Sequence, residues 1–465
     1  MNYTTLFTTD RPVRVGLIGT GAFGTSFLAQ ASAIPNLIVT VVSDRNIEIG
    51  VAACRQAGRA QESIVACANA RAVQRTVESG RTAVVDDPTL LVTGPVDLLV
   101  EATGDPGAGA EHAHLALTHG LHVVMVSKET DSVVGPILAK MARDAGLVYT
   151  PGDGDQPALL IGLITWAETL GLEIICAGKA AEADMIFDPS AGVVAKGRRT
   201  LQLTVPEMDR FFPDPAADLI ELNQARRQSL SGLCRASVAD LCEMAIVMNN
   251  SGYNYDRPQL HAPVARLSET VELFGAQSEG GLLSREGVVD VVNCLRGPDE
   301  VGMAGGVFVV VHCQDDDTWR MLASKGHILN RSRNRALLYL PRHLLGVEIA
   351  TSIFCAALLG QPTGGVDVRP MVDVTARTTE ALPAGTLLSM DHGHAIAGLT
   401  PELAPMRALA DANPIPYYLA AGRRLARDVA AGDILTGAMF EPAVSTLERL
   451  RMEQDRVFAP EIRSR

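Results

Sequence analysis

Short apolar runs alternate with helical patterns along the first 150 residues of the chain. The apolar runs have strand length and lie at 13–18, 37–42, 97–102, 122–127 and 147–150, with an edge strand or connection at 80–86. Helical patterns fall between several of them, at 23–33, 111–118 and 135–145. Strands and helices that alternate in this way form a parallel sheet covered by helices. The pattern therefore predicts an α/β fold that opens with a parallel-sheet domain over residues 1–150.

The alternation stops at PGDGDQP, residues 151–157, which we take as the first domain boundary. Beyond it the pattern predicts helices over 158–170 and 236–248 and strands over 173–178 and 307–312. Residues 249–306 are dense in Gly, Asn, His and Glu and are expected to form loops that line a site. An apolar helix over 346–359 is expected to pack back on the first domain.

A second connector, QPTGGVDVRP at 361–370, precedes a region of short strand signals and turns. Two stretches of this region echo each other, at 381–388 and 429–435, each with an Ala-Gly turn before an apolar pair. The predicted domains are therefore 1–150, 151–365 and 366–465.

Composition narrows the class of partner. The 465 residues are 20% charged with a net charge of −13 and no block of like charges, which argues against nucleic acid. No apolar run approaches the roughly 20 residues of a membrane helix, and the first residues do not read as a secretory signal. The eight scattered cysteines form no CxxC pair and suit a reducing compartment. We expect a cytoplasmic protein with a small-molecule substrate and no membrane partner.

The strongest local signal is a glycine-rich turn between the first strand and the first helix. It runs Gly19-Thr20-Gly21-Ala22-Phe23-Gly24. The first glycine of such a turn makes the bend, the second admits a pyrophosphate, and the third allows close helix packing. The helix amino terminus adds a positive dipole end. The segment predicts a dinucleotide site.

Asp44 and Arg45 follow the second predicted strand, 20 residues after Gly24. A carboxylate there would bind the adenine ribose and favour NAD, whereas the arginine would pair with the 2′-phosphate of NADP. The Asp44-Arg45 pair therefore does not decide between NAD and NADP as the cofactor.

Two further strand ends carry candidate cofactor and substrate groups. Ala102, Thr103 and Gly104 follow one strand, and their small size would let a ribose lie close. Lys128 follows the next strand along the chain and is expected to face the nicotinamide and the substrate. A solvated lysine at a strand end is the alternative.

Lys179 comes directly after an apolar strand of the second domain and is one of only five lysines, against 35 arginines. A lysine in a cleft can donate to a substrate oxygen, and burial would tune its pKa toward neutrality. Glu182, Asp184 and Asp188 follow within nine residues. These carboxylates would orient the lysine, hold a divalent cation, or form a solvated loop.

Other polar groups gather in the region predicted as loops. They are Asn249, Asn250, His261, Glu279 and Asp290, followed later by Lys325 and His327, which would suit a phosphate or carboxylate. The chain has no GxSxG, HExxH or GxxxxGK[ST] motif, so these hydrolase, metalloprotease and P-loop motifs give no alternative.

Taken together, the motifs resemble homoserine-dehydrogenase-like NAD(P) oxidoreductases with a carboxyl-terminal SAF (β-clip) domain, similar to the 1-deoxyxylulose-5-phosphate reductoisomerase-like (DRL) enzymes. The resemblance rests on segments 15–24, 101–104, 151–157, 177–179, 261–266, 279–290 and 306–311. It implies a Rossmann domain, a central α+β catalytic domain, the SAF module and a homo-oligomer. It also implies a catalytic pocket around Lys179 with Asp155, His261 and Glu279 near it.

Several functions fit this resemblance. The leading one is an NAD(P)-dependent oxidoreductase for a small polyol, hydroxy acid or sugar phosphate. Reductoisomerase chemistry on 1-deoxyxylulose 5-phosphate, which would need a divalent metal, and homoserine dehydrogenase are alternatives. A non-catalytic alternative is a nucleotide sensor whose SAF module binds a carbohydrate.

Overall fold

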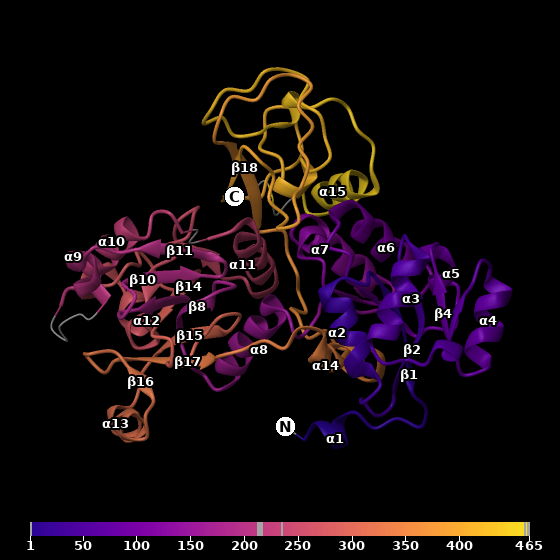
Figure 1. The fold of residues 1–465 in the computed structure, drawn as a ribbon, viewed down its shortest axis with the longest axis horizontal. Coiled ribbons are helices and arrows are strands. Elements are labelled where there is room, and N and C mark those ends of the chain that lie inside the picture. Colours follow the sequence, from indigo (N-terminus) through magenta and orange to yellow (C-terminus); the bar gives the residue numbers. More distant parts are fainter. Residues whose placement is uncertain (1, 212–216, 234–235, 460–461, 463–465) are drawn as a thin grey trace. The chain divides into compact units, whose positions relative to one another are not determined.

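The computed structural model describes residues 2–211, 217–233, 236–459 and 462. These residues form two compact units (Figure 1). The first contains Met1–Ala158, Leu344–Thr400 and Ala404–Arg465, and the second contains Leu159–His343 with Pro401–Leu403. Each unit has its own sheet and its own core.

The first unit is built on a seven-stranded parallel sheet in the order β3-β4-β2-β1-β5-β6-β7. Its strands are β1 (Val13–Ile18), β2 (Leu37–Ser43), β3 (Ile64–Ala66), β4 (Thr82–Val85), β5 (Leu98–Glu101), β6 (His122–Met125) and β7 (Tyr149–Pro151). The order runs outward from β1 in both directions, which creates a switch point where open parallel sheets bind ligands. The predicted parallel sheet is confirmed, although β3 was not predicted and β4 lies inside the sheet instead of at its edge.

Helices connect these strands and begin where the sequence offers caps. They are α2 (Ala22–Ala31), α3 (Ile47–Gln56), α4 (Ala70–Glu78), α5 (Pro88–Val92), α6 (Pro106–Thr118) and α7 (Lys128–Asp144). The side chains of Asn46, Asn69, Asp87 and Asp105 accept backbone N–H groups at the starts of α3 to α6. Such caps satisfy donors that a helix end leaves unpaired. Pro88 and Pro106 occupy the first helical position, where proline costs no hydrogen bond.

The apolar segment 346–359 completes the core of the first unit, as predicted. It forms η4 (Leu345–Val347), α14 (Ala350–Phe354) and the π-helical turn η5 (Cys355–Leu359). Ile349, Ile353 and Phe354 are buried in one cluster with the apolar residues of β1, β2 and β5.

The C-terminal part contains β18 (Val372–Thr378), β19 (Leu399–Pro405) and the helix α15 (Thr446–Val457), joined by turns and isolated bridges. The two echoing stretches pair with each other, because Leu382 and Val429 exchange backbone hydrogen bonds of 2.9 Å. The SAF identity of this part stays a prediction.

Helix α15 lies against α6 and α7 (Figure 1). Pro136 interrupts the hydrogen-bond ladder of α7, and the amide of Gln454 inserts beside it. The Ile137 N–H donates to Gln454 Oε1 at 3.1 Å, and Gln454 Nε2 donates to the Val133 carbonyl at 3.3 Å. One buried side chain thus bridges a donor and an acceptor that an unbroken helix would pair directly.

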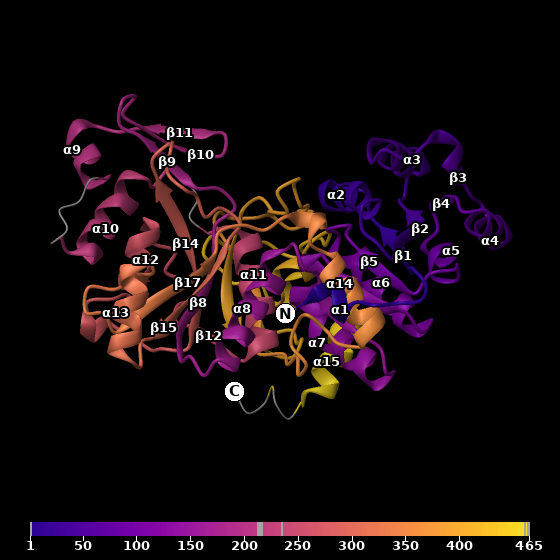
Figure 2. The same ribbon diagram turned by 90° about the horizontal axis from the view of Figure 1, so that it is seen from below.

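The second unit contains a mixed sheet in the order β11-β10-β9-β14-β8-β15-β17-β16, with β12 and β13 also on β14. Its strands are β8 (Ile174–Ala180), β9 (Met185–Asp188), β10 (Val193–Lys196), β11 (Arg199–Gln202), β12 (Asn254–Tyr255), β13 (Val264–Ala265), β14 (Val288–Arg296), β15 (Val307–His312), β16 (Ile328–Leu329) and β17 (Arg335–Leu340). Figure 2 shows β14 and β8 side by side in this unit. Its longer helices are α8 (Gln156–Thr169), α10 (Leu219–Ser229), α11 (Val238–Ser251), α12 (Leu267–Leu273) and α13 (Asp316–Ser324).

The loop prediction for 249–306 is wrong in part. The central strand β14 runs through it, and Asn249 and Asn250 lie within α11. Strand β14 carries Asp290 and Asn293, polar residues that break its apolar run, yet both are fully buried because the fold supplies their hydrogen-bond partners. Among the described residues, no helix combines the length and the apolar character needed to cross a bilayer.

Candidate active site

The glycine turn has the geometry of a dinucleotide loop. Gly19 has φ of +93°, and a Cβ there would lie 2.6 Å from the carbonyl of Ala102. A Cβ on Gly24 would lie 2.1 Å from the Gly19 oxygen. Gly21, the N-cap of α2, has no side chain to cap the helix, and outside the neighbouring part of the chain no described atom lies within 4 Å of its Cβ position. The loop thus has no room for side chains at Gly19 and Gly24 and leaves space at Gly21. This space lies at the amino terminus of α2, where the helix dipole stabilises an anion.

Asp44 lies at the end of β2 beside this loop. Its Oδ2 accepts a hydrogen bond of 2.5 Å from the Thr20 hydroxyl, and its Oδ1 accepts from the Asn46 N–H at 3.1 Å. Its half-buried carboxylate is therefore fixed at the position where the acidic residue that binds the adenine ribose is expected. Arg45 is exposed.

The ends of β5 and β6 meet at the opposite side of the switch point. The Gly104 N–H donates to Ser127 Oγ at 2.8 Å, which joins the two strand ends. Buried Glu101 accepts a hydrogen bond of 2.6 Å from the Thr103 hydroxyl. Lys128 is half-buried and opens α7 at this edge.

Three acidic residues of the first unit, Asp131, Asp153 and Asp155, follow Lys128 in the chain. Burial raises the pKa of Asp131 to about 7; a 2.9 Å hydrogen bond from the Tyr149 hydroxyl opposes the rise, and the charge of Asp155 adds to it. Burial likewise raises the pKa of Asp153 to about 7. Asp155 itself lies just before α8, where its Oδ1 accepts the Gln156 N–H at 3.0 Å.

Lys179 is fully buried on β8 and is held by two buried carboxylates from α11. Its Nζ lies 2.8 Å from Asp240 Oδ1, hydrogen-bonds to Glu243 Oε2, and lies 3.8 Å from Glu182 Oε1. Asp240 and Glu243 are three residues apart on one helix, so they share a face. Asp240 also caps α11 through its other oxygen, which accepts the Ser237 N–H at 2.7 Å.

The charge state of Lys179 differs from the expectation. Burial alone would lower its pKa, but the charges of Asp240, Glu243 and Glu182 outweigh that penalty and raise the pKa above its ordinary value. The prediction of a pKa tuned toward neutrality is therefore wrong, because it considered desolvation without the two partners. At neutral pH the group is an ammonium.

The carboxylates that follow Lys179 in sequence do not surround it as a group. Asp184 pairs with Arg296 at 2.7 Å, and Asp188 closes an exposed turn with Ser190. Only Glu182 approaches the lysine. The residues that hold Lys179 were missed because they lie 61 and 64 positions further on, although their i, i+3 spacing in a predicted helix was a usable signal.

His261 lies in a separate polar cluster of the second unit. Its Nε2 lies 2.7 Å from Asp256 Oδ2, and within the described residues its buried Nδ1 makes no hydrogen bond. Asp290 holds the surrounding backbone, since its carboxylate accepts the N–H groups of His261 and Ala262 at 3.0 Å. These hydrogen bonds hold Ala262 at a φ of +44°, which is a strained conformation for a non-glycine residue.

His261 borders a cavity of ≈ 840 Å³ between α10 and two loops of the second unit. Polar groups that line it include Asn223, Gln224, Arg227, Gln228, Arg257 and Gln277. Lys179 is not among its lining residues. Two guanidinium groups and several amides suit a polar or anionic small molecule.

Three further predicted residues, Glu279, Lys325 and His327, form no hydrogen bond or ion pair with Lys179 among the described residues. Glu279 neutralises the buried guanidinium of Arg335 at 2.7 Å, which gives it a structural partner. Lys325 and His327 are exposed at the end of α13. The structure thus places Lys128 and Asp155 in the first unit and Lys179, His261 and Glu279 in the second. Within the described residues, the last three form no hydrogen bond or ion pair with one another.

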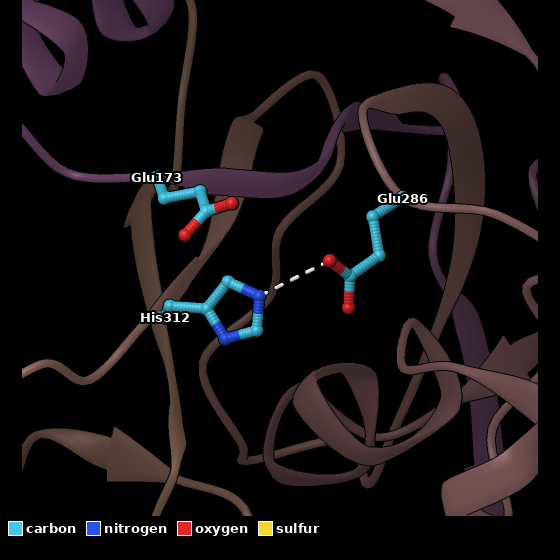
Figure 3. Close-up of side chains that lie close together, drawn as sticks. All are labelled: Glu173, Glu286 and His312. Atoms are coloured by element: carbon cyan, nitrogen blue, oxygen red, sulfur yellow. Dashed lines mark hydrogen bonds and ion pairs between the residues drawn. The ribbon is translucent and has the colours of Figure 1, made fainter.

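The described residues offer few side chains that are placed to bind a metal ion together. Within the described part of the chain, one group of side chains has suitable proximity, namely Glu173, Glu286 and His312 at one end of β14, β8 and β15 (Figure 3). His312 Nε2 lies 3.1 Å from Glu286 Oε2. Both glutamates are exposed, and the carboxylates around Lys179 already neutralise an ammonium. A divalent metal therefore remains only a sequence-based hypothesis.

Two family models match consecutive parts of the chain. Residues 19–150 match the homoserine dehydrogenase NAD binding domain, and residues 154–349 match the catalytic domain of oxidoreductase DRL. These matches confirm the predicted order of an NAD(P)-binding Rossmann domain and a DRL-type catalytic domain. The domain content is that of an NAD(P)-dependent oxidoreductase. A search of the curated proteins finds no match to the chain.

Solved dehydrogenases show a distant similarity. A probable dehydrogenase from Thermotoga maritima is 13% identical over 75% of this chain and 90% of its own, with a TM-score of 0.35. GenD2 from gentamicin A biosynthesis, in complex with NAD, is 15% identical over 76% and 89%, also at 0.35. The myo-inositol dehydrogenase from Lactobacillus casei is 19% identical over 38% of this chain, with a TM-score of 0.27, and the alignment spans only 48% of its length.

Proposed function

We propose that the protein transfers a hydride between a nicotinamide dinucleotide and a small hydroxylated substrate, a polyol, hydroxy acid or sugar phosphate. The observation that carries the proposal is the glycine turn of the first unit. The second unit adds Lys179 with its two carboxylates, Asp240 and Glu243, a group that we call the buried clamp.

The residues of the first unit fit the dinucleotide. Gly21 leaves the amino terminus of α2 open, and Gly19 and Gly24 have no room for a side chain. The α2 amino terminus would hold the pyrophosphate, Asp44 the adenine ribose, and Thr103 and Gly104 the nicotinamide half. When bound, the dinucleotide supplies a ring carbon that accepts or returns a hydride.

Lys179 is proposed as the group that polarises the substrate oxygen. Because Asp240 and Glu243 keep it protonated at neutral pH, it acts as a hydrogen-bond donor whose charge the two carboxylates neutralise. A fixed donor stabilises the negative charge that develops on an oxygen during hydride transfer, without any reorganisation. The carboxylates also hold the ammonium at one position, which favours a defined geometry.

The polar cavity beside His261 is proposed to bind the substrate's polar or anionic end. Arg227 reaches the His261 carbonyl at 2.7 Å, so one arginine is preorganised at its wall. The Asp256–His261 pair offers a further polar group, with Asp256 fixing one ring nitrogen of the histidine.

The test is a panel of polyols, aldonates and their phosphates incubated with NAD and NADP, followed by nicotinamide absorbance. Turnover that disappears in Gly21→Val and falls in Lys179→Met supports the proposal. Dinucleotide binding without turnover on any substrate would instead favour a nucleotide sensor. The DRL-domain match keeps reductive isomerisation of 1-deoxyxylulose 5-phosphate as the second candidate; metal-dependent turnover of that substrate alone would select it.

A further inference from the structure

A histidine from the C-terminal part of the first unit reaches the strand ends of the parallel sheet. His394 Nδ1 lies 2.5 Å from Oε1 of Glu129, whose side chain is only 2% exposed in the first turn of α7. The imidazole also packs on Gly104, since a Cβ at Gly104 would lie 2.6 Å from His394 Cε1. His394 therefore adjoins the residues that follow both β5 and β6.

The loop holds His394 at a backbone cost. Its φ is +61°, a conformation that non-glycine residues rarely adopt unless the surroundings impose it. Asp391 imposes it here, because its Oδ1 accepts the N–H groups of Gly393 and Ala395 at 2.8 and 2.9 Å. The His394 N–H closes the turn on the Asp391 carbonyl at 3.0 Å.

The C-terminal part is also fastened to α7 independently of this loop. Gln454 of α15 bridges the break in α7 beside Pro136. Buried Arg451 of α15 in turn binds Asp373 of β18 through two hydrogen bonds of 2.7 Å. Because α7 carries Glu129 as well, α15 and the His394 loop attach to the same helix.

We propose that His394 is a cofactor-binding residue of the dinucleotide site and that it presents its Nε2 to the nicotinamide half of the cofactor. The inference rests on the proposed function. Nδ1 is held by Glu129, and within the described residues no hydrogen bond reaches Nε2. The side chain is 36% exposed, whereas its Nδ1 is buried. The rest of the ring can therefore meet a ligand, and a ribose hydroxyl or the carboxamide offers an acceptor for Nε2.

The charge of the imidazole gives this contact a pH dependence. The hydrogen bond from His394 to Glu129 raises the pKa of His394; burial and the charge of Lys128 oppose the rise, and Asp391 adds to it. Among the described residues, Glu129, Lys128 and Asp391 are the charged residues that act on the ring. Only the protonated ring donates from both nitrogens, so cofactor affinity should fall as the pH rises through the pKa of His394.

The experiment measures the Kd of NADH and NADPH by calorimetric titration across pH 6 to 9. The variant is His394→Asn, because asparagine tolerates the left-handed backbone. His392→Ala, two positions earlier on the exposed part of the loop, is the matched control. Loss of a charged hydrogen bond predicts a Kd about 10- to 100-fold higher at pH 6 for His394→Asn and no change for the control.

The pH profile separates cofactor binding from a merely structural role. The wild-type Kd should rise above the pKa of His394, whereas the His394→Asn profile should lose this step while its thermal midpoint stays near the wild-type value. A His394→Asn Kd within twofold of wild type, or an unchanged pH step, overturns the inference. A wild-type protein that binds neither dinucleotide refutes the proposed function instead.

Discussion

Replacing Lys179 by methionine tests the buried clamp of the second unit most sharply. The substitution keeps the apolar stem and removes the ammonium, which leaves Asp240 and Glu243 facing each other without a cation. Their side chains are 4% and 0% exposed, so water cannot replace the lost partner. Breaking a buried ion pair from one side costs about 3–5 kcal/mol.

The expected loss is large enough to measure without knowing the substrate. For a unit of this size, each kcal/mol shifts the thermal midpoint by about 2–4 °C, so the transition should fall by roughly 6–20 °C. Urea unfolding gives the free energy of unfolding directly. The double variant Lys179→Met/Glu243→Gln should recover part of the loss, because it removes one of the stranded charges.

The same pair of variants distinguishes catalysis from stability. A positioned acid–base or polarising group contributes about 100- to 10,000-fold in rate, so the double variant should remain slow even where its fold is restored. Lys179→Arg should also be slow, because the guanidinium is larger and planar. A Lys179→Met protein with wild-type unfolding free energy would refute the clamp, and restored turnover in the double variant would leave the lysine a structural residue.

Three further predictions concern the first unit. Asp44→Ala should weaken NAD binding more than NADP binding, since the lost ribose contact is specific to NAD and the lost charge opposes a 2′-phosphate; equal Kd changes in parallel titrations would place Asp44 outside the ribose site. Gln454→Ala should lower the unfolding free energy by about 1–3 kcal/mol for each backbone group left unpaired at the break in α7, whereas an unchanged urea midpoint would show that the bridge contributes nothing. Because the folded pKa of Asp131 is raised to about 7, the native state binds this proton more tightly than the unfolded chain, and stability should fall as the pH rises from about 4 to 7. Asp131→Asn should flatten that decline in urea unfolding measured at several pH values, and a decline of wild-type size in the variant would assign it to another group.

Local patterns predicted the first unit well. Its strands are apolar runs separated by capped helices, and the glycine turn has meaning only in that strand–helix setting, so sequence spacing and structure coincide. Strand β3 escaped prediction because three residues give too little periodicity to separate from a loop.

The strands of the second unit and the contacts between distant segments could not be predicted from local sequence patterns. Strand β14 carries polar residues whose partners come from elsewhere in the chain, and Lys179 takes its charge state from a helix more than 60 residues away. His394 and Gln454 reach α7 across more than 250 and 300 residues, respectively, with no spacing signal. Tertiary pairing of this kind follows from the fold and not from local propensity.

Dinucleotide titration of Gly21→Val tests the central claim most directly. A Cβ at Gly21 would meet no described atom within 4 Å outside the neighbouring part of the chain, so the variant should fold normally while its methyl groups occupy the place of the pyrophosphate. Gly162→Val, at an equally open glycine of α8, controls for adding the same side chain elsewhere. We predict that wild type and Gly162→Val bind NAD or NADP and that Gly21→Val, with an intact thermal transition, does not. Equal affinity in all three proteins would contradict the assignment of the dinucleotide site.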